Sequence, residues 1–185
     1  YTGENLRPPI DRDVTLTFET GSVCGNNLYL PHWAIRLSDL ESANPPSHFR
    51  MTNTILTTSR TLKTEDRGFA CIVASNPHPV RFAMVRELNR YDQVATYGKA
   101  FGNPVGSKRD VLPLFRFALV PENDLYPGYV TEKALDAWMG GAIPIWWGSD
   151  ALGYLNPDAM INAAEMDFSD LPDVIADLCR DRDKY

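Results

Sequence analysis

Residues Gly128–Gly148 read GYVTEKALDAWMGGAIPIWWG, a stretch in which two elements of secondary structure can be predicted with their boundaries. The first is a short helix from Glu132 to about Met139, with one apolar face. Thr131 can cap its start, and the glycine pair 140–141 supplies a left-handed stop. The second is the buried strand AIPIWWG. A helix that runs directly into a buried strand is typical of βαβ units with a parallel sheet.

The same alternation extends over the chain from about Arg67 onward. Short apolar runs predict strands, and apolar residues at helical spacing predict helices. In chain order the further predicted elements are a strand in Phe69–Asn76, a helix in PVRFAMVRELNRY (residues 79–91), a strand at Phe115–Val120 and an amphipathic helix around residues 171–178, capped by Ser169 or Asp170. Residues 1–65 are rich in Pro, Asn, Ser and Thr, with only weak periodicity. The predicted fold class is α/β with a mostly parallel sheet.

Composition narrows the classes of function. The chain of 185 residues has 44% hydrophobic and 23% charged residues, which are globular values. Its net charge of −6 and the absence of a Lys/Arg-rich run argue against a nucleic-acid partner. No apolar run approaches the roughly 18–20 residues of a transmembrane segment, and the first residues lack the apolar core of a signal peptide. We therefore expect a soluble chain in which any anionic ligand is small and held locally.

The cysteines and histidines do not form a metal-binding pattern. Cysteine occurs at positions 24, 71 and 179, outside any CxxC motif, which favours reduced structural thiols in a cytosolic compartment. The histidines at positions 32, 48 and 78 are equally scattered. The acidic DRD at residues 11–13 has the letters of a metal-binding Asp-X-Asp pair but no strand before it. We expect no metal and no other cofactor.

Charged residues near two helix starts indicate where a ligand would bind. In parallel sheets, ligands bind beyond the carboxyl ends of the strands, where helix amino termini favour anions. Glu132 and Lys133 lie in the first turn of one such helix, and Arg81 opens the earlier one, so both cations are expected at the same edge of the sheet. The plainer alternative is that Glu132 only favours the helix dipole, while Lys133 and Arg81 are solvated surface residues. From the residues alone the prediction stops at an α/β protein that binds a nucleotide or phosphate.

A longer stretch carries a family resemblance. PENDLYPGYVTEKALDAWMGGAIPIWWGS, residues 121–149, closely resembles the donor-binding motif of the α-1,3-fucosyltransferases, glycosyltransferase family 10. Three further stretches agree with the bacterial members: YTGEN at residues 1–5, GFACIVASNPHPVR at residues 68–81 and MDFSDLPDVIADL at residues 166–178. The resemblance covers most of residues 66–185 and only patches before them. Pro121 departs from the family pattern, which has an aromatic residue there.

The resemblance implies a GT-B fold, in which two Rossmann-like domains face each other across a cleft. Residues 66–185 would be the domain that binds the GDP-sugar, and residues 1–65 a remnant of the amino-terminal acceptor domain with a linker. Family members carry a complete domain ahead of YTGEN and continue beyond the last helix, so the chain resembles only part of the full enzyme. Donor binding could then survive in this chain while turnover is lost.

The resemblance also implies roles for individual residues. The residues that match the family's donor site are Arg81, Asn123, Tyr129, Glu132 and Lys133. Lys133 and Arg81 would stabilise the leaving GDP, and Glu132 would bind a donor hydroxyl or stabilise positive charge at the anomeric carbon. Glu4, in YTGEN, matches the proposed catalytic base, so that Glu4 and Glu132 are the expected catalytic residues.

The implied reaction is the inverting, metal-independent transfer of L-fucose from GDP-fucose to a hydroxyl of an N-acetyllactosamine-type glycan, in α-1,3 or α-1,4 linkage. Two alternatives stay open: a non-catalytic module that binds a nucleotide sugar, and a GT-B transferase with another donor, since the crevice alone does not select fucose or guanine. The bacterial resemblance favours the cytoplasm, with peripheral association with the inner membrane left open.

Overall fold

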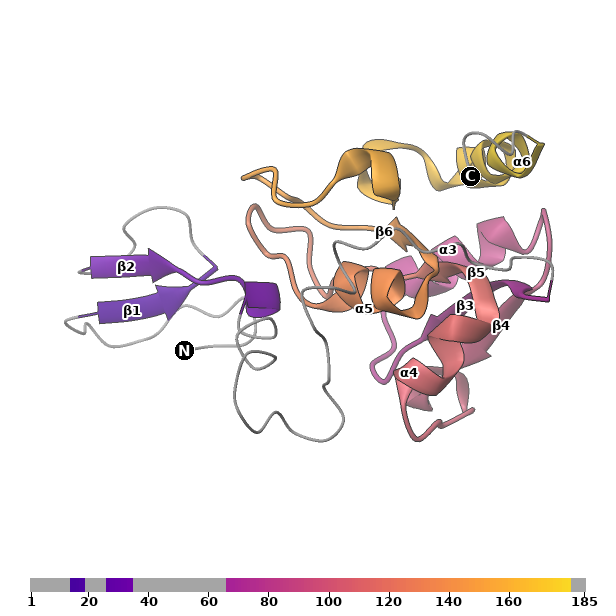
Figure 1. The fold of residues 1–185 in the computed structure, drawn as a ribbon, viewed down its shortest axis with the longest axis horizontal. Helices are drawn as coiled ribbons and strands as arrows, with labels where there is room; N and C mark the ends of the chain where they lie inside the picture. Colours follow the sequence, from indigo (N-terminus) through magenta and orange to yellow (C-terminus); the bar gives the residue numbers. More distant parts are fainter. Residues whose placement is uncertain (1–13, 19–25, 35–65, 181–185) are drawn as a thin grey trace.

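The computed structural model describes residues 14–18, 26–34 and 66–180 (Figure 1). Two sheets are present in this part of the chain. Strands β1 (Val14–Thr17) and β2 (Asn26–Tyr29) form a parallel pair, which is followed by a helical turn at residues 32–34. The larger sheet and its helices begin at Gly68 and contain the expected donor motif.

The larger sheet has five strands in the order β4-β3-β5-β6-β7, and all its pairings are parallel. The strands are β3 (Gly68–Val73), β4 (Val94–Tyr97), β5 (Phe115–Leu119), β6 (Ile143–Trp146) and β7 (Ile161–Asn162). Residue Cys71 of β3 pairs with Ala95 on one side and with Ala118 on the other. The predicted α/β class with a parallel sheet is confirmed.

Helices cover both faces of this sheet. The α-helices are α3 (Pro79–Leu88), α4 (Lys108–Val111), α5 (Lys133–Gly140) and α6 (Leu171–Arg180). Short 3₁₀ turns complete the connections: η1 (Lys99–Phe101), η2 (Leu112–Leu114), η3 (Pro157–Ala159), η4 (Ala163–Glu165) and η5 (Phe168–Asp170). The arrangement has three layers, with α3 and α6 on one face and α4 and α5 on the other.

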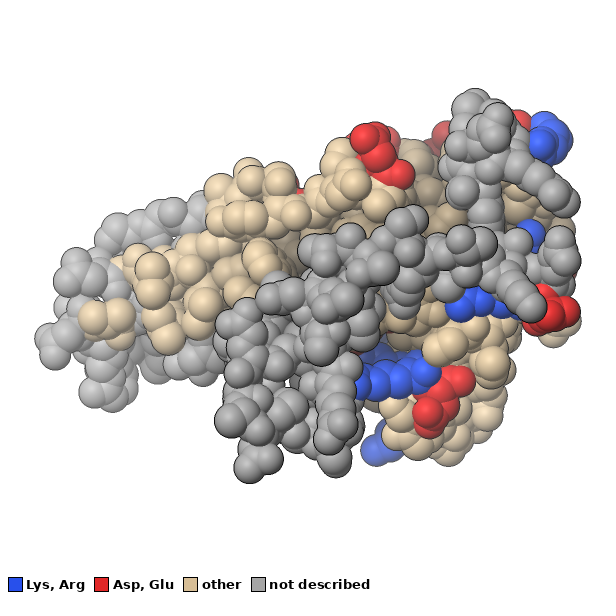
Figure 2. All heavy atoms as spheres, in the orientation of Figure 1, with Lys and Arg blue, Asp and Glu red and all other residues tan. Residues whose placement is uncertain are grey.

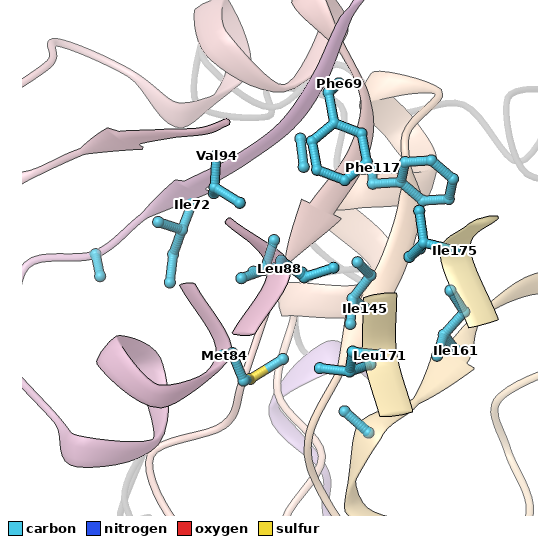
Figure 3. Packing of buried hydrophobic residues seen from close by; sticks show 14 residues of the cluster. Phe69, Ile72, Met84, Leu88, Val94, Phe117, Ile145, Ile161, Leu171 and Ile175 are labelled. Carbon is cyan, nitrogen blue, oxygen red and sulfur yellow. The ribbon is translucent and has the colours of Figure 1, made fainter. Parts of the chain in front are cut away.

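Alternating side chains of the strands build the core on both faces. On the α3 and α6 face, Ile72 and Phe117 pack with Met84 of α3 and Ile175 of α6 (Figure 3). On the other face, the intervening Cys71 packs beneath α4 and α5. Burial raises the pKa of the Cys71 thiol to about 12, so this cysteine is an inert core residue.

The predicted strands and helices from Phe69 to residue 178 are confirmed, but the predicted cap at Thr131 is wrong. Thr131 does not cap α5, because both its N–H and its hydroxyl donate to Glu122. Glu132 takes the cap position, but its side chain accepts no bond from the N–H groups at the helix start. The predicted cap residues of the last helix, Ser169 and Asp170, lie in η5, which ends directly before α6, and their capping of α6 stays a prediction. The stop at Gly141 is confirmed, with a left-handed φ of 71°.

Two general features of the described residues concern helix length and the distribution of charge. None of the helices in the described ranges is long and apolar enough to cross a membrane. In the view of Figure 2, the described lysine and arginine side chains lie in separate places, several beside acidic ones, so they form no continuous basic area among the described residues of this face.

Candidate functional site

A small cavity lies at the carboxyl edge of the sheet, between β3 and β5. The chain leaves β3 for β4 on one side and returns to β5 on the other, so the strand order reverses between β3 and β5. Such a switch point is where open α/β sheets bind ligands. The cavity has a volume of about 70 Å³. Its described lining consists of Ile72, Val73, Ala74, Arg81, Lys108, Leu112, Leu119, Val120, Pro121, Lys133 and Asp136.

Arg81 reaches this cavity from the first turn of α3. His78 caps the helix by accepting a bond from the Val80 N–H, and Arg81, three residues after this cap, is buried. Residue Arg81 is only 6% exposed, and its guanidinium donates from Nη1 to the Asn76 carbonyl and from Nη2 to Asn123 Oδ1 at 2.8 Å. Burial lowers the pKa of Arg81, while nearby Glu122 opposes that effect. Arg81 is therefore a buried, oriented cation and not a solvated surface residue.

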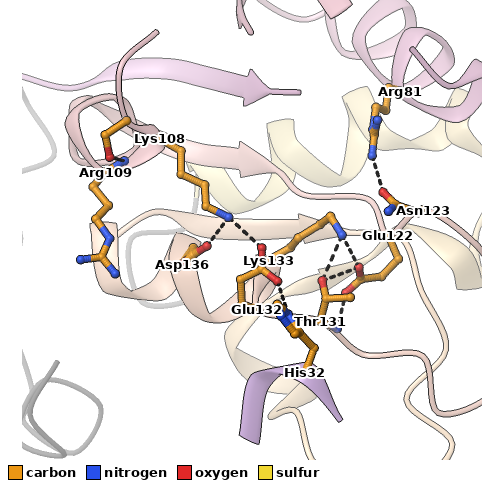
Figure 4. A network of polar contacts seen from close by, with 11 residues as sticks. His32, Arg81, Lys108, Arg109, Glu122, Asn123, Thr131, Glu132, Lys133 and Asp136 are labelled. Atoms are coloured by element: carbon orange, nitrogen blue, oxygen red, sulfur yellow. Dashed lines mark hydrogen bonds and ion pairs between the residues drawn. The ribbon is translucent and has the colours of Figure 1, made fainter. Parts of the chain in front are cut away.

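Lys133 is held by a buried carboxylate, Glu122, which follows β5 (Figure 4). Its Nζ donates to Glu122 Oε2 at 2.7 Å and to Thr131 Oγ1 at 3.0 Å. Glu122 is fully buried and also accepts from the Thr131 N–H at 2.9 Å, the Thr131 hydroxyl at 2.6 Å and Trp146 Nε1 at 3.3 Å. These bonds fix the loop before α5 to the adjacent strand β6, and they hold Lys133, which lines the cavity.

Glu132 lies in a second group of charges beside the first. Its Oε1 accepts from Lys108 Nζ at 2.9 Å, and its Oε2 lies 2.7 Å from His32 Nδ1. Lys108 also forms an ion pair with Asp136, which is 3% exposed. Burial alone would raise the pKa of Glu132, but the His32 bond and the charges of Lys108 and Lys133 outweigh it and hold that pKa well below its usual range. Glu132 is ionised at neutral pH.

The predicted site residues are only partly gathered around the cavity. Arg81 and Lys133 line it together, while Asn123 and Glu132 bond to residues that line it. Tyr129 is 1% exposed, and its ring packs edge-on against Phe18 with the centroids 4.8 Å apart. Glu4, the expected base, lies outside the described residues. The roles assigned to these residues stay predictions.

Four residues of this hydrogen-bond and ion-pair network were not assigned to the site from the sequence: Lys108, Glu122, Asp136 and His32. One signal for Lys108 was available, because Glu132 and Asp136 are four residues apart and face the same side of a helix. Two adjacent acids on a buried helix face require a cation, and that cation is Lys108, which lies far from them in the chain. His32 carried no such signal, because it lies in a weakly periodic stretch.

Among the described residues, the cations that line the cavity are balanced by carboxylates. Arg81, Lys108 and Lys133 face Glu122, Glu132 and Asp136. Burial lowers the pKa of Lys108, but Asp136 and Glu132 more than compensate and raise it. No group of three or more His, Cys, Asp or Glu side chains in the described ranges could hold a metal ion. The arrangement suits a small oxyanion bound by the N–H groups that the internal pairs leave over.

A parallel sheet with oriented cations at its switch point is typical of α/β domains that bind nucleotides or phosphates. Comparison with known proteins narrows this class. Residues 63–185 match the family model described as glycosyltransferase family 10 (fucosyltransferase), C-terminal part. The chain belongs to this family.

Two curated relatives and two solved structures illustrate the similarity. The α-(1,3)-fucosyltransferase FucT of Helicobacter pylori is 37% identical over 125 residues, which cover 64% of this chain and 26% of that protein. The human 4-galactosyl-N-acetylglucosaminide 3-α-L-fucosyltransferase 9 is 34% identical over 91 residues, 46% of this chain and 25% of that protein. The chain thus spans about a quarter of the length of the curated relatives it matches.

The solved structures match over the whole of this chain. A crystal structure of an α1,3-fucosyltransferase has a TM-score of 0.80 at 28% identity and is covered to 61%. A crystal structure of an α1,3-fucosyltransferase with GDP-fucose has a TM-score of 0.78 at 28% identity and is covered to 63%. The predicted GT-B type of fold is confirmed by these matches. The division into residues 1–65 and 66–185 stays a prediction.

Proposed function

We propose that this chain carries the donor-binding part of an inverting α-1,3-fucosyltransferase, which moves L-fucose from GDP-fucose to a hydroxyl of an N-acetylglucosamine-containing glycan. The observation that carries the proposal is the set of Arg81, Lys108 and Lys133 around one cavity at the switch point of the sheet. The solved relative with GDP-fucose supports the choice of donor, since the cations alone fit any diphosphate.

The cations have hydrogen-bonding capacity left for a diphosphate. A lysine ammonium has three donors and an arginine guanidinium five. Lys133 uses two donors, on Glu122 and Thr131, and Arg81 donates to Asn76 and Asn123. The remaining N–H groups of residues that line the cavity can bind phosphate oxygens without loss of the internal bonds. Such preorganised donors stabilise the charge that develops on the leaving GDP.

The proposed chemistry needs one base and one stabilised leaving group. Glu4 removes the proton of the acceptor hydroxyl, and that oxygen attacks C1 of the fucose from the face opposite to GDP. The C1–O bond to the phosphate breaks, and its electron pair leaves with GDP beside Arg81 and Lys133. In this scheme Glu132 stabilises positive charge at C1, and no metal takes part. We propose a bacterial, cytoplasmic setting for this reaction.

Calorimetric titration of the chain with GDP-fucose, GDP-mannose and UDP-glucose in excess EDTA tests the donor site. Selective binding of the guanine nucleotides supports the proposal, and Lys133→Met should weaken that binding. Preference for UDP-glucose would favour a GT-B transferase with another donor. Absence of binding would contradict a donor site formed by this chain.

Transfer is tested separately, by analysis of the products formed from GDP-fucose and N-acetyllactosamine. A fucosylated product supports the enzyme, and Glu4→Gln should abolish it while donor binding is kept. Donor binding without a fucosylated product, even where GDP is released by hydrolysis, would favour the non-catalytic binding module.

A further inference from the structure

The described amino-terminal segment contacts the loop between β5 and α5 at three points. The Phe18 ring packs on Tyr129, the Tyr29 hydroxyl donates to the Gly128 carbonyl at 3.0 Å, and His32 Nδ1 lies 2.7 Å from Glu132 Oε2. These partners lie within residues 128–132, which start the GYVTEK part of the donor motif. A segment about a hundred residues away in the sequence therefore holds the loop that precedes α5.

Of these three contacts, the one made by His32 involves a charged residue of the site, Glu132. An ionised carboxylate can only accept hydrogen bonds, so His32 Nδ1 carries the proton and donates to Glu132. The other oxygen of Glu132 accepts from Lys108 at 2.9 Å. With one donor on each oxygen, the plane of the carboxylate is fixed (Figure 4). His32 is thereby connected through Glu132 to Lys108, which lines the cavity.

We propose that His32 is a positioning residue for the donor site, which acts through Glu132 to hold Lys108 and the loop of residues 128–132 in the geometry that binds a diphosphate. This inference rests on the proposed function, because it assigns a role in donor binding. It adds a determinant of affinity that lies outside the donor domain.

The Kd for GDP tests the inference with matched variants of the whole chain. His32→Ala should weaken GDP binding about tenfold, near the lower end of what a hydrogen bond to a charged group contributes. His32→Asn, whose amide nitrogen can take the place of Nδ1, should restore binding to within about threefold of the original. Leu28→Ala is the control, because Leu28 lies in the same segment and its side chain is 58% exposed. If His32→Ala fails to fold, His32→Phe keeps the bulk of the ring and removes the donor.

A double substitution separates positioning from general support of the fold. If His32 acts through Glu132, His32→Ala should have little further effect on the Kd in a Glu132→Ala background, where the hydrogen-bond partner of His32 is absent. Full additivity of the two substitutions would overturn the inference, as would an unchanged Kd in His32→Ala.

Amide hydrogen exchange supplies a readout that needs no ligand. The N–H groups of Gly128, Tyr129, Val130 and Thr131 are all hydrogen-bonded, so the loop should be protected from exchange. His32→Ala should speed exchange in this loop, whereas Leu28→Ala should not. Faster loop exchange in a chain that does not bind GDP would contradict the proposed function and leave the positioning by His32 supported. Unchanged loop exchange in His32→Ala, together with normal GDP binding, would overturn the inference about His32 and leave the proposed function standing.

Discussion

Glu122→Gln should strongly destabilise the chain, although the substitution changes one atom. The carboxylate is fully buried and accepts bonds from Thr131, Lys133 and Trp146. An amide keeps one accepting oxygen and turns the other position into a donor. If the amide nitrogen takes the Oε2 position, it faces the ammonium of Lys133, which cannot accept a bond; if the amide is turned round, it faces the N–H donors of Thr131 and Trp146 instead.

The magnitude follows from the bonds that are lost. A hydrogen bond to a charged group contributes about 1.5–3 kcal/mol, and breaking a buried ion pair costs about 3–5 kcal/mol. The Lys133 side chain is 20% exposed, and water can therefore solvate part of its charge. The lower end applies, and we expect a loss of about 3 kcal/mol in the free energy of unfolding, or about 6–12 °C in Tm.

Urea denaturation followed by tryptophan fluorescence measures this loss, since Trp146 itself contacts Glu122. Asp177→Asn is the control: it makes the same chemical change at the exposed pair with Arg180 and should shift stability by less than about 0.5 kcal/mol. Removal of the ammonium by Lys133→Met should reduce the cost of Glu122→Gln by about 1.5 kcal/mol. A loss below about 1 kcal/mol, or strict additivity of the two substitutions, would refute the argument from the unpaired ammonium.

Three further outcomes are expected. Lys133→Met should weaken GDP binding about 10- to 100-fold in calorimetry, the range of a lost charge-assisted bond, and an unchanged Kd would remove it from the site. Because the folded-state pKa of Glu132 is depressed, its stabilisation is complete above about pH 4.3 and is lost as the pH falls further. The difference in unfolding free energy between the original chain and Glu132→Gln should therefore narrow from pH 6 to pH 3; a constant difference would contradict the ion pairs. Gly140→Ala should lower the free energy of unfolding by about 1–3 kcal/mol, and with it Tm, because the new Cβ would lie 2.7 Å from Leu112 Cβ. Gly106→Ala is the control: its Cβ meets nothing within 4 Å, and Tm should not change in the same melting assay.

The sequence predicted the elements whose apolar pattern is long enough to carry a period. Strands β3, β5 and β6 and helices α3, α5 and α6 were predicted close to their bounds. Strand β4 and helix α4, of four residues each, and the two-residue strand β7 were missed. Strand β6 is as short as β4, but it lies in the apolar run AIPIWWG, whereas β4 and α4 read VATY and KRDV and have no such run. The cap at Thr131 was mispredicted for another reason: a buried acceptor, Glu122, competes for the threonine hydroxyl.

The site was predictable where local order in the chain places the residues, and not where the tertiary structure does. Arg81 and Lys133 follow directly from the rule that helices begin at the carboxyl edge of a parallel sheet. Lys108 belongs to KRDV, which has the composition of a solvated charge run, and only the fold brings it to Glu132. His32 reaches the same carboxylate across most of the chain, which no local pattern encodes.

The wholly parallel sheet sets the order in which the protein can assemble during synthesis. Parallel neighbours cannot be joined by a tight hairpin, so each new strand must wait for its crossover to collapse. Strand β3 therefore pairs on its second edge only after β4 and α4 have been made. The loop before α5 waits longer still, because the Glu122 N–H donates to Trp147 and the Gly128 N–H to Ser149, both beyond β6. The Lys133 side of the cavity thus assembles after the first strands of the core, and a nascent chain released before Ser149 lacks it.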